Sequence, residues 1–144
     1  MQKVFQLSLF VLLAASLSAC TTSGDSSANS PNFGQLMSET TGQNGRACIR
    51  TRDIRGYGAE NDKQININTM SKYYIATTLY SCHNLTMAPR ALFESRFTEA
   101  CGGTSYITTR EGRCPIDKIF EFDNREQAFA AAKLVNDKLA QSKE

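Results

Sequence analysis

Apolar and polar side chains alternate through the middle of the chain in the manner of β-strands. In residues 64–69 every second side chain is Ile or Thr, and the three between them are Gln or Asn. A period of two with one polar face predicts an antiparallel strand that exposes that face to water. Residues 73–80 are dense in β-branched and aromatic side chains, which favours a strand in the centre of a sheet.

Three further runs show strand character: residues 48–55, 104–109 and 115–122. The first ends at the turn signal Gly56-Tyr57-Gly58, and the last places Ile116, Phe120 and Phe122 on one face. Residues 87–97 fit either a helical turn or a strand. The strands follow one another without helical periodicity between them. We therefore expect a mainly β fold over residues 46–122, an antiparallel sheet rolled into a small barrel or sandwich.

The period changes to that of a helix after Phe122. Asp123 and Glu126 form the pattern of a capping box, with Asp123 as the cap. We predict a helix over residues 125–141, and residues 123–144 as the C-terminal helix and tail. Its apolar stripe comprises Ala128, Ala132, Val135 and Leu139, flanked by Phe129 and Leu134. Such a helix packs across the sheet or its open end; the alternative is a free amphipathic tail for a partner or a membrane surface.

The N-terminal 19 residues have the composition of a secretory signal peptide. One positive charge, Lys3, precedes the apolar run 4–13, which is shorter than the roughly 20 residues of a membrane span. Leu17-Ser18-Ala19-Cys20 resembles the lipobox of bacterial lipoproteins. The resemblance implies that Cys20 carries a diacylglycerol and a further acyl chain. Thr21, in place of Asp, implies sorting to the outer membrane. An uncleaved anchor, a buried helix and cleavage without lipidation are the alternatives.

Residues 20–45 are predicted to be a lipidated cysteine followed by a flexible linker. The stretch 21–31 holds no apolar residue larger than Ala, so it has too little apolar surface to offset the entropy of ordering. Phe33, Leu36 and Met37 interrupt it at roughly helical spacing. These three side chains form either a helical turn docked on the domain or an apolar part of the tether.

Removing residues 1–19 leaves 125 residues, enough for one domain, with 15 basic and 14 acidic side chains. A net charge of this size gives no reason to expect long-range attraction to nucleic acid. The chain contains no Trp, and its modest core favours a covalent supplement.

Five cysteines become an even set of four once Cys20 is set aside: Cys48, Cys82, Cys101 and Cys114. In an oxidising compartment they predict two disulfides, for which three pairings are open. We favour Cys82–Cys101 with Cys48–Cys114, because one loop then nests within the other. A zinc site is disfavoured, since there is no Cys-x-x-Cys and only one His. No cofactor or metal is expected.

Few residues suggest catalysis. His83 is the only His, and Ser81 and Ser105 are candidate nucleophiles only if folding brings one of them to it. No nucleophile elbow is present, and we interpret His83 as a surface loop residue. The stretch Gly102–Ser105 offers two readings, an anion cradle or a tight turn, and a lone Gly pair favours the turn.

Arginines form the clearest charged cluster: Arg46, Arg50, Arg52 and Arg55. On a strand, Arg50 and Arg52 share a face, where they can meet phosphate or carboxylate groups of lipopolysaccharide or peptidoglycan. We take Arg50, Arg52 and Arg55 as the candidate contact with an anion or partner. The alternative is a solvated face balanced by Asp53 and Glu60.

The order of these features resembles the bacterial lipoproteins of the domain-of-unknown-function 6491 family, over roughly residues 47–122. The matching positions are Cys48-Ile49, Ile54 to Tyr57, Asp62, Tyr74, Cys82-x-x-Leu85, Cys101-Gly102 and Cys114-Pro115-Ile116. His83-Asn84 departs from the Pro or Gly that members often have there. The resemblance implies no catalytic residues, since none are established for the family.

These patterns together predict a lipid-anchored cell-envelope protein on the inner leaflet of the outer membrane, facing the periplasm. We expect a non-enzymatic binding or structural module, whose partner is a protein, peptidoglycan or lipopolysaccharide. The alternatives are a periplasmic inhibitor or immunity-type protein, with Tyr57 or Tyr106 at the tip of an exposed loop, and a small hydrolase.

Overall fold

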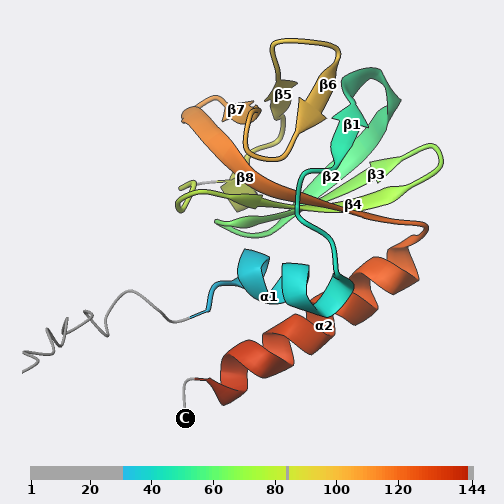
Figure 1. The fold of residues 1–144 in the computed structure, drawn as a ribbon. Coiled ribbons are helices and arrows are strands. Elements are labelled where there is room, and N and C mark those ends of the chain that lie inside the picture. The colour runs from blue at the N-terminus through green and yellow to red at the C-terminus, as the bar shows by residue number, and fades with distance from the viewer. Residues whose placement is uncertain (1–30, 84, 143–144) are drawn as a thin grey trace, which may run out of the picture.

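The computed structural model describes residues 31–83 and 85–142, which form a curled antiparallel sheet with two helices below it and a two-stranded ribbon above it (Figure 1). The mainly β fold with a C-terminal helix is thus as predicted. Within those residues no helix is both long and apolar enough to cross a bilayer. The elements in chain order are α1 (Phe33–Thr41), β1 (Cys48–Arg50), the 3₁₀ turn η1 (Thr51–Asp53), β2 (Ile54–Asn61), β3 (Gln64–Thr69), β4 (Tyr73–Thr78), the 3₁₀ turn η2 (Leu85–Met87), β5 (Leu92–Glu94), β6 (Glu99–Cys101), β7 (Tyr106–Thr109), β8 (Gly112–Phe122) and α2 (Arg125–Gln141).

The six-stranded sheet has the order β2-β3-β4-β8-β7-β5 and curls into a half-barrel whose edges meet through side chains. Tyr57 of β2 meets Phe93 of β5 edge-on, with ring centroids 6.2 Å apart. The Tyr57 hydroxyl also donates to the carbonyl of Ala88 at 3.0 Å. In place of the expected barrel, the sheet is a half-barrel whose two edges are bridged by Tyr57 and have no backbone ladder between them. Its interior is an apolar core that includes Ile49, Ile65, Ile67, Tyr74, Ala76, Ile107, Ile116 and Ile119.

Both faces of the central strand β4 are covered, which explains its dense apolar composition. Tyr74 and Ala76 face the barrel interior, whereas Ile75 faces the helices. The prediction of a central strand is confirmed, although β4 ends at Thr78 and Leu79 and Tyr80 are exposed beyond it.

A bulge in β8 overturns one predicted face. Thr77 pairs with Lys118 but Thr78 pairs with Ile116, so Asp117 has no partner on β4. The extra residue reverses the alternation. Ile116 therefore lies in the barrel core, while Phe120 and Phe122 pack against the helices.

The first predicted strand is also divided. Residues 48–50 form β1 and pair with β6, the turn η1 follows, and β2 starts at Ile54. The glycines of Gly56-Tyr57-Gly58, expected to end the strand, lie within β2, which is an edge strand. The chain thus leaves one sheet for another where a single run was expected.

Helix α1 occupies residues that were assigned to the linker. Asn32 caps it in a capping box with Gln35, and Gly42 ends it at φ 71°. Leu36 and Met37 are buried against α2 and the sheet. Of the two alternatives for these apolar residues, docking on the domain is observed, and the packed structure begins near Asn32, ahead of the predicted boundary at residue 46.

Helix α2 has the predicted bounds and buries Ala128, Ala132 and Val135 of the predicted stripe. Its cap lies one residue later than predicted. The Asn124 side chain accepts from the Gln127 amide at 2.9 Å, while the Asp123 carboxylate binds the Lys72 ammonium at 2.6 Å. Because the Asp123 side chain pairs with Lys72 in the turn before β4, Asn124 is the N-cap residue of the helix.

Candidate functional site

The long strand β8 gathers distant parts of the chain along one edge. Past its pairing with β7, the Ile119 amide donates to the Gly45 carbonyl at 2.8 Å, and the Ala47 amide donates to the Ile119 carbonyl at 3.3 Å. The Gly103 amide donates to the Ile116 carbonyl at 3.1 Å. The segment 43–47 is thereby brought beside the β6–β7 turn, and Arg46 lies at the junction.

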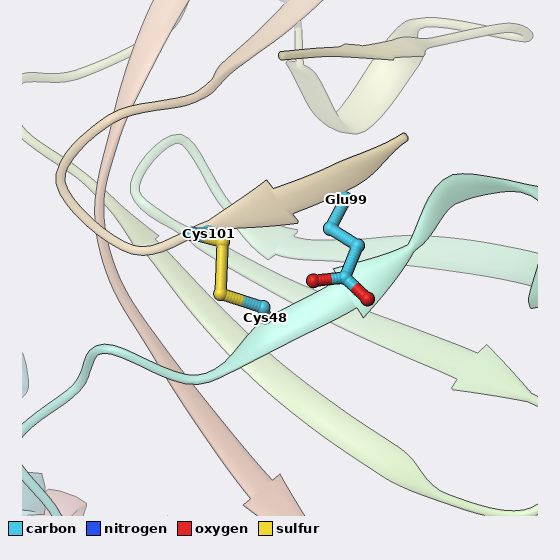
Figure 2. Close-up of side chains that lie close together, drawn as sticks. All are labelled: Cys48, Glu99 and Cys101. Carbon is cyan, nitrogen blue, oxygen red and sulfur yellow. A yellow bond between two sulfur atoms is a disulfide. The ribbon is translucent and has the colours of Figure 1, made fainter. Parts of the chain in front are cut away.

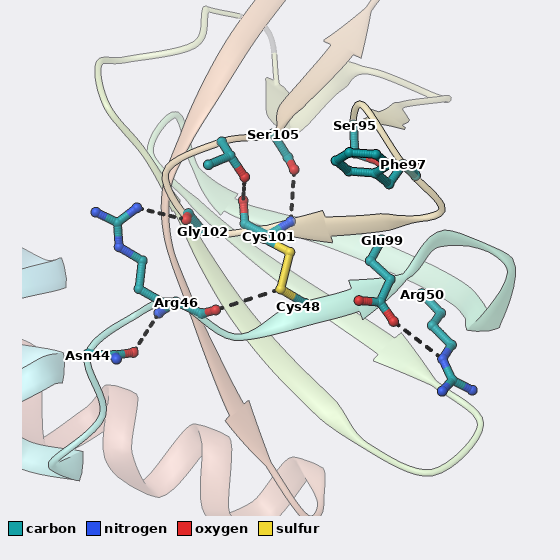
Figure 3. The surroundings of a disulfide bond; sticks show 11 residues. Asn44, Arg46, Cys48, Arg50, Ser95, Phe97, Glu99, Cys101, Gly102 and Ser105 are labelled. Carbon is teal, nitrogen blue, oxygen red and sulfur yellow. Dashed lines mark hydrogen bonds and ion pairs between the residues drawn. A yellow bond between two sulfur atoms is a disulfide. The ribbon is translucent and has the colours of Figure 1, made fainter.

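Arg46 is held by the glycine pair of that turn (Figure 3). Its Nη1 donates to the Gly102 carbonyl at 3.1 Å, and its guanidinium fills the space that a Cβ at Gly103 would need. A Cβ at Gly102 would lie 2.0 Å from the carbonyl oxygen of Gly45. Gly103 has φ 81°, in the region that favours glycine. The glycine pair is thus the expected tight turn, and it orients an arginine.

Two disulfides join all four predicted cysteines, but the favoured pairing is wrong. Cys48 bonds to Cys101 and Cys82 bonds to Cys114. Cys48 and Cys101 are directly opposite each other in the β1–β6 ribbon, so strand register decides the pair. The nested arrangement considered loop lengths alone, and loop lengths do not reveal which strands are neighbours.

Glu99 lies beside the Cys48–Cys101 disulfide, with the three side chains on one face of the ribbon (Figure 2). Three such groups resemble a metal site, but both sulfur atoms are engaged in the disulfide and the Glu99 carboxylate faces Arg50, at 3.5 Å from its Nε. Cysteine binds a metal ion as the free thiolate. In this oxidised form the cluster cannot supply the sulfur ligands.

A groove of about 930 Å³ opens beside this ribbon, between the β5–β6 loop and the β7–β8 hairpin. Its charged lining consists of Arg46, Arg96, Arg113 and a single carboxylate, Glu99. Arg113 stacks over the ring of Tyr106, 3.7 Å from its centroid, and its Nε lies 3.0 Å from the Glu94 carboxylate. Three arginines along one hollow favour an anionic ligand, because the fork of donors on a guanidinium matches phosphate and carboxylate.

Polar and aromatic groups complete the groove. Phe97 is 84% exposed at its rim, where an aromatic face is available to an incoming ligand. Ser105 is buried in its wall, and its hydroxyl accepts from the Cys101 amide at 2.8 Å. That hydrogen bond fixes this wall of the groove beside the disulfide. Arg96 makes no ion pair within residues 31–83 and 85–142, which leaves its charge for a ligand.

The profile of a family of unknown function, DUF6491, matches residues 3–137, nearly the whole chain. The chain belongs to this family. The match confirms the predicted resemblance and extends it beyond residues 47–122 at both ends. Comparison with curated proteins and with solved structures gave no match.

In this DUF6491 protein the three arginines proposed from sequence lie on three successive elements. Arg50 lies on β1 and meets Glu99, Arg52 lies in η1 with its Nε 3.8 Å from Asp53, and Arg55 lies on β2. Arg50 and Arg52 were predicted to share a face of one strand, but the chain turns at Thr51 and places them on different elements. None of the three lines the groove, whereas Arg46 of the same sequence cluster does.

The groove itself was missed by the sequence reading. Arg96 and Arg113 are isolated in the sequence and converge only because β5, β7 and β8 are neighbours in the sheet. The available signal was the concentration of arginine: eight of the nine lie within residues 46–113.

Of the other predicted residues, Ser105 and Tyr106 line the groove, whereas Ser81, His83 and Tyr57 do not. His83 and Ser81 are exposed beside Cys82, and no hydrogen bond in the described part of the chain joins His83 to Ser81 or to Ser105. Neither tyrosine is at a loop tip as the inhibitor hypothesis required. Tyr57 lies within β2 against Phe93, and Tyr106 lies on β7 under Arg113. Cys20 falls outside the described residues.

A second polar cluster joins the β3–β4 turn to the start of α2. Lys72 contacts the carboxylates of Glu121 and Asp123, and hydrogen bonds to Asp123 and then Glu121 raise its pKa. The Tyr74 hydroxyl donates to Glu121 at 3.2 Å. Burial, followed by the Glu121 charge, raises the pKa of Tyr74 to about 12. Its groups satisfy one another, so we interpret the cluster as structural.

Proposed function

We propose that this protein is a lipid-anchored module of the bacterial cell envelope that binds an anionic envelope component through the groove and catalyses no reaction. The observation that carries the proposal is the convergence of Arg46, Arg96 and Arg113 on one hollow. The ligand chemistry is a phosphate or a carboxylate group, as found in lipopolysaccharide and in peptidoglycan. The exposed ring of Phe97 provides an apolar surface next to the charges.

The proposed location follows from Cys20. A lipobox-like sequence and four cysteines joined in two disulfides both suit an exported lipoprotein, because stable disulfides belong to oxidising compartments. Two acyl chains suffice for stable anchoring. Thr21 favours the inner leaflet of the outer membrane, with the domain in the periplasm. Replacing Cys20 by Ala is expected to release the protein from membrane fractions, and continued retention would contradict the anchor.

Arg96 gives the sharpest test of the groove, because Arg46 also holds the glycine turn and Arg113 pairs with Glu94. Losing one hydrogen bond to a charged ligand costs about 1.5–3 kcal/mol, so Arg96→Gln is expected to weaken binding at least about tenfold. Arg55→Gln removes the same charge from an exposed position on β2, away from the groove, and is expected to leave affinity unchanged.

The probes are deacylated lipopolysaccharide and soluble muropeptides, titrated onto the lipidated protein in nanodiscs. If phosphatase treatment of the lipopolysaccharide abolishes its binding, the group recognised by the groove is phosphate. If muropeptides bind, the group recognised is carboxylate. Equal weakening by Arg96→Gln and Arg55→Gln, or absence of binding by both probes, would refute the proposed groove.

A further inference from the structure

Three exposed apolar side chains lie in the segment between β4 and β5: Leu79 and Tyr80 directly follow β4, and Met87 lies beside the β7–β8 turn. Leu79 is 64% exposed, Tyr80 51% and Met87 78%. We call these three residues the tether end. None of them lines the groove. Several large exposed apolar side chains in one short segment are candidates for a contact surface.

The described residues of that segment are attached to the sheet by backbone hydrogen bonds and a disulfide. The Leu79 amide donates to the Pro115 carbonyl at 3.0 Å, and the Cys82 amide donates to the Asp62 carbonyl at 2.8 Å. Cys82 and Leu85 are buried, and Cys82 is bonded to Cys114. Cys82 and Leu85 thus face the core, while Leu79, Tyr80 and Met87 of the same segment face outward.

The chain enters the domain beside this end. Asn32 caps α1, and Asn32, Phe33 and Leu79 line a common hollow. Figure 1 shows the start of α1 on the same side as the segment after β4 and the β7–β8 turn. From Cys20, the twelve residues 21–32 span at most about 40 Å when fully extended. A lipid on Cys20 therefore keeps the tether end within reach of the bilayer.

We propose that the tether end docks on the lipid surface, with Leu79, Tyr80 and Met87 in the interfacial region of the bilayer. This inference rests on the lipid anchor of the proposed function. Tyr suits the interface because its ring is apolar and its hydroxyl polar, and Leu and Met bury apolar surface there. Docking in this way leaves the groove open to the periplasm.

Charge does not drive this contact. The turns beside the tether end carry Asp62 with Lys63, and Arg110 with Glu111, so their opposite charges balance, and the segment between β4 and β5 adds only the positive charge of Arg90. Apolar insertion is largely independent of ionic strength, whereas attraction between exposed charges is screened by salt. Docking is therefore expected on uncharged phosphatidylcholine and at high salt.

The chain has no Trp, so a single Trp substitution reports on one position alone. Met87→Trp places the reporter at the tether end. Met70→Trp is the matched control, since Met70 is 70% exposed in the β3–β4 turn, at the opposite end of the sheet. Leu79→Trp is a second reporter in case Met87→Trp disturbs the fold, which circular dichroism reveals. Each lipidated variant, purified from membranes, is reconstituted into phosphatidylcholine vesicles with and without brominated acyl chains.

Brominated chains quench Trp only at short range. For interfacial residues inserted about 5–10 Å, the emission of Met87→Trp and Leu79→Trp is expected to fall at least about twofold and to shift to shorter wavelength. Met70→Trp is expected to change little. If the protein floats with the vesicles but all reporters stay unquenched, or all are quenched alike, the lipid-docked orientation is wrong although the anchor holds. If the protein does not float with vesicles, the anchor itself is wrong and the orientation falls with it.

Discussion

Truncation of Met37 tests whether α1 belongs to the folded domain. Met37 is fully buried between α1, α2 and the sheet. Met37→Ala removes three heavy atoms, worth about 0.8 kcal/mol each in transfer free energy, and leaves a cavity that adds to this. We expect the free energy of unfolding to fall by about 3 kcal/mol, which lowers the midpoint of thermal unfolding by about 12 °C for a domain of this size.

The assay is thermal unfolding of the full-length protein, followed by circular dichroism. Met70→Ala is the control, because it makes the same chemical change at an exposed position and is expected to alter stability by less than about 0.5 kcal/mol. If Met37→Ala and Met70→Ala melt together, α1 contributes nothing to the domain and the linker extends to residue 45 as the sequence indicated.

Two further predictions concern the β6–β7 region. Gly102→Ala is expected to lower the free energy of unfolding by about 1–3 kcal/mol in chemical denaturation, because its Cβ would meet the Gly45 carbonyl oxygen. Gly58→Ala is the control, because a Cβ there has open space and is expected to leave stability unchanged. Equal effects of the two changes would mean that the backbones at Gly102 and Gly45 are not in contact. Dithiothreitol is expected to reduce Cys48–Cys101 before Cys82–Cys114, because Cys48 is exposed and Cys82 is buried. Alkylation followed by peptide mass spectrometry measures the order, and prior reduction of Cys82–Cys114 would contradict it.

Local patterns predicted those elements whose side chains follow one simple rule. Residues 64–69 and 73–78 form strands, and α2 has the expected bounds, because a one-sided or fully covered surface imposes a regular period. Helix α1 was predicted only as one of two alternatives, a single helical turn, because its nine residues carry few apolar side chains. Such short helices are marginal alone and are stabilised by tertiary contacts, here Leu36 and Met37 against α2.

Features that depend on which segments are neighbours were not accessible. The bulge at Asp117 inserts one residue and moves Ile116 to the other face of the sheet, and nothing in the local composition indicates that a bulge is present. The disulfide partners follow from the register of β1 with β6. The groove has the same origin, because Arg46, Arg96 and Arg113 are far apart in the sequence and meet only in the folded sheet.

The position of β8 has a consequence for the order in which the molecule is built. β8 pairs with β4 on one side and with β7, the β6–β7 turn and segment 43–47 on the other, so it is the common neighbour of early and late parts of the chain. It is also the last strand to be synthesised. Contacts such as Gly45 with Ile119 span more than 70 residues, and contacts of such long separation form slowly. Residues 43–47 can therefore pair with β8 only after nearly the whole domain has been synthesised. The wall of the groove that contains Arg46 forms late in folding for the same reason.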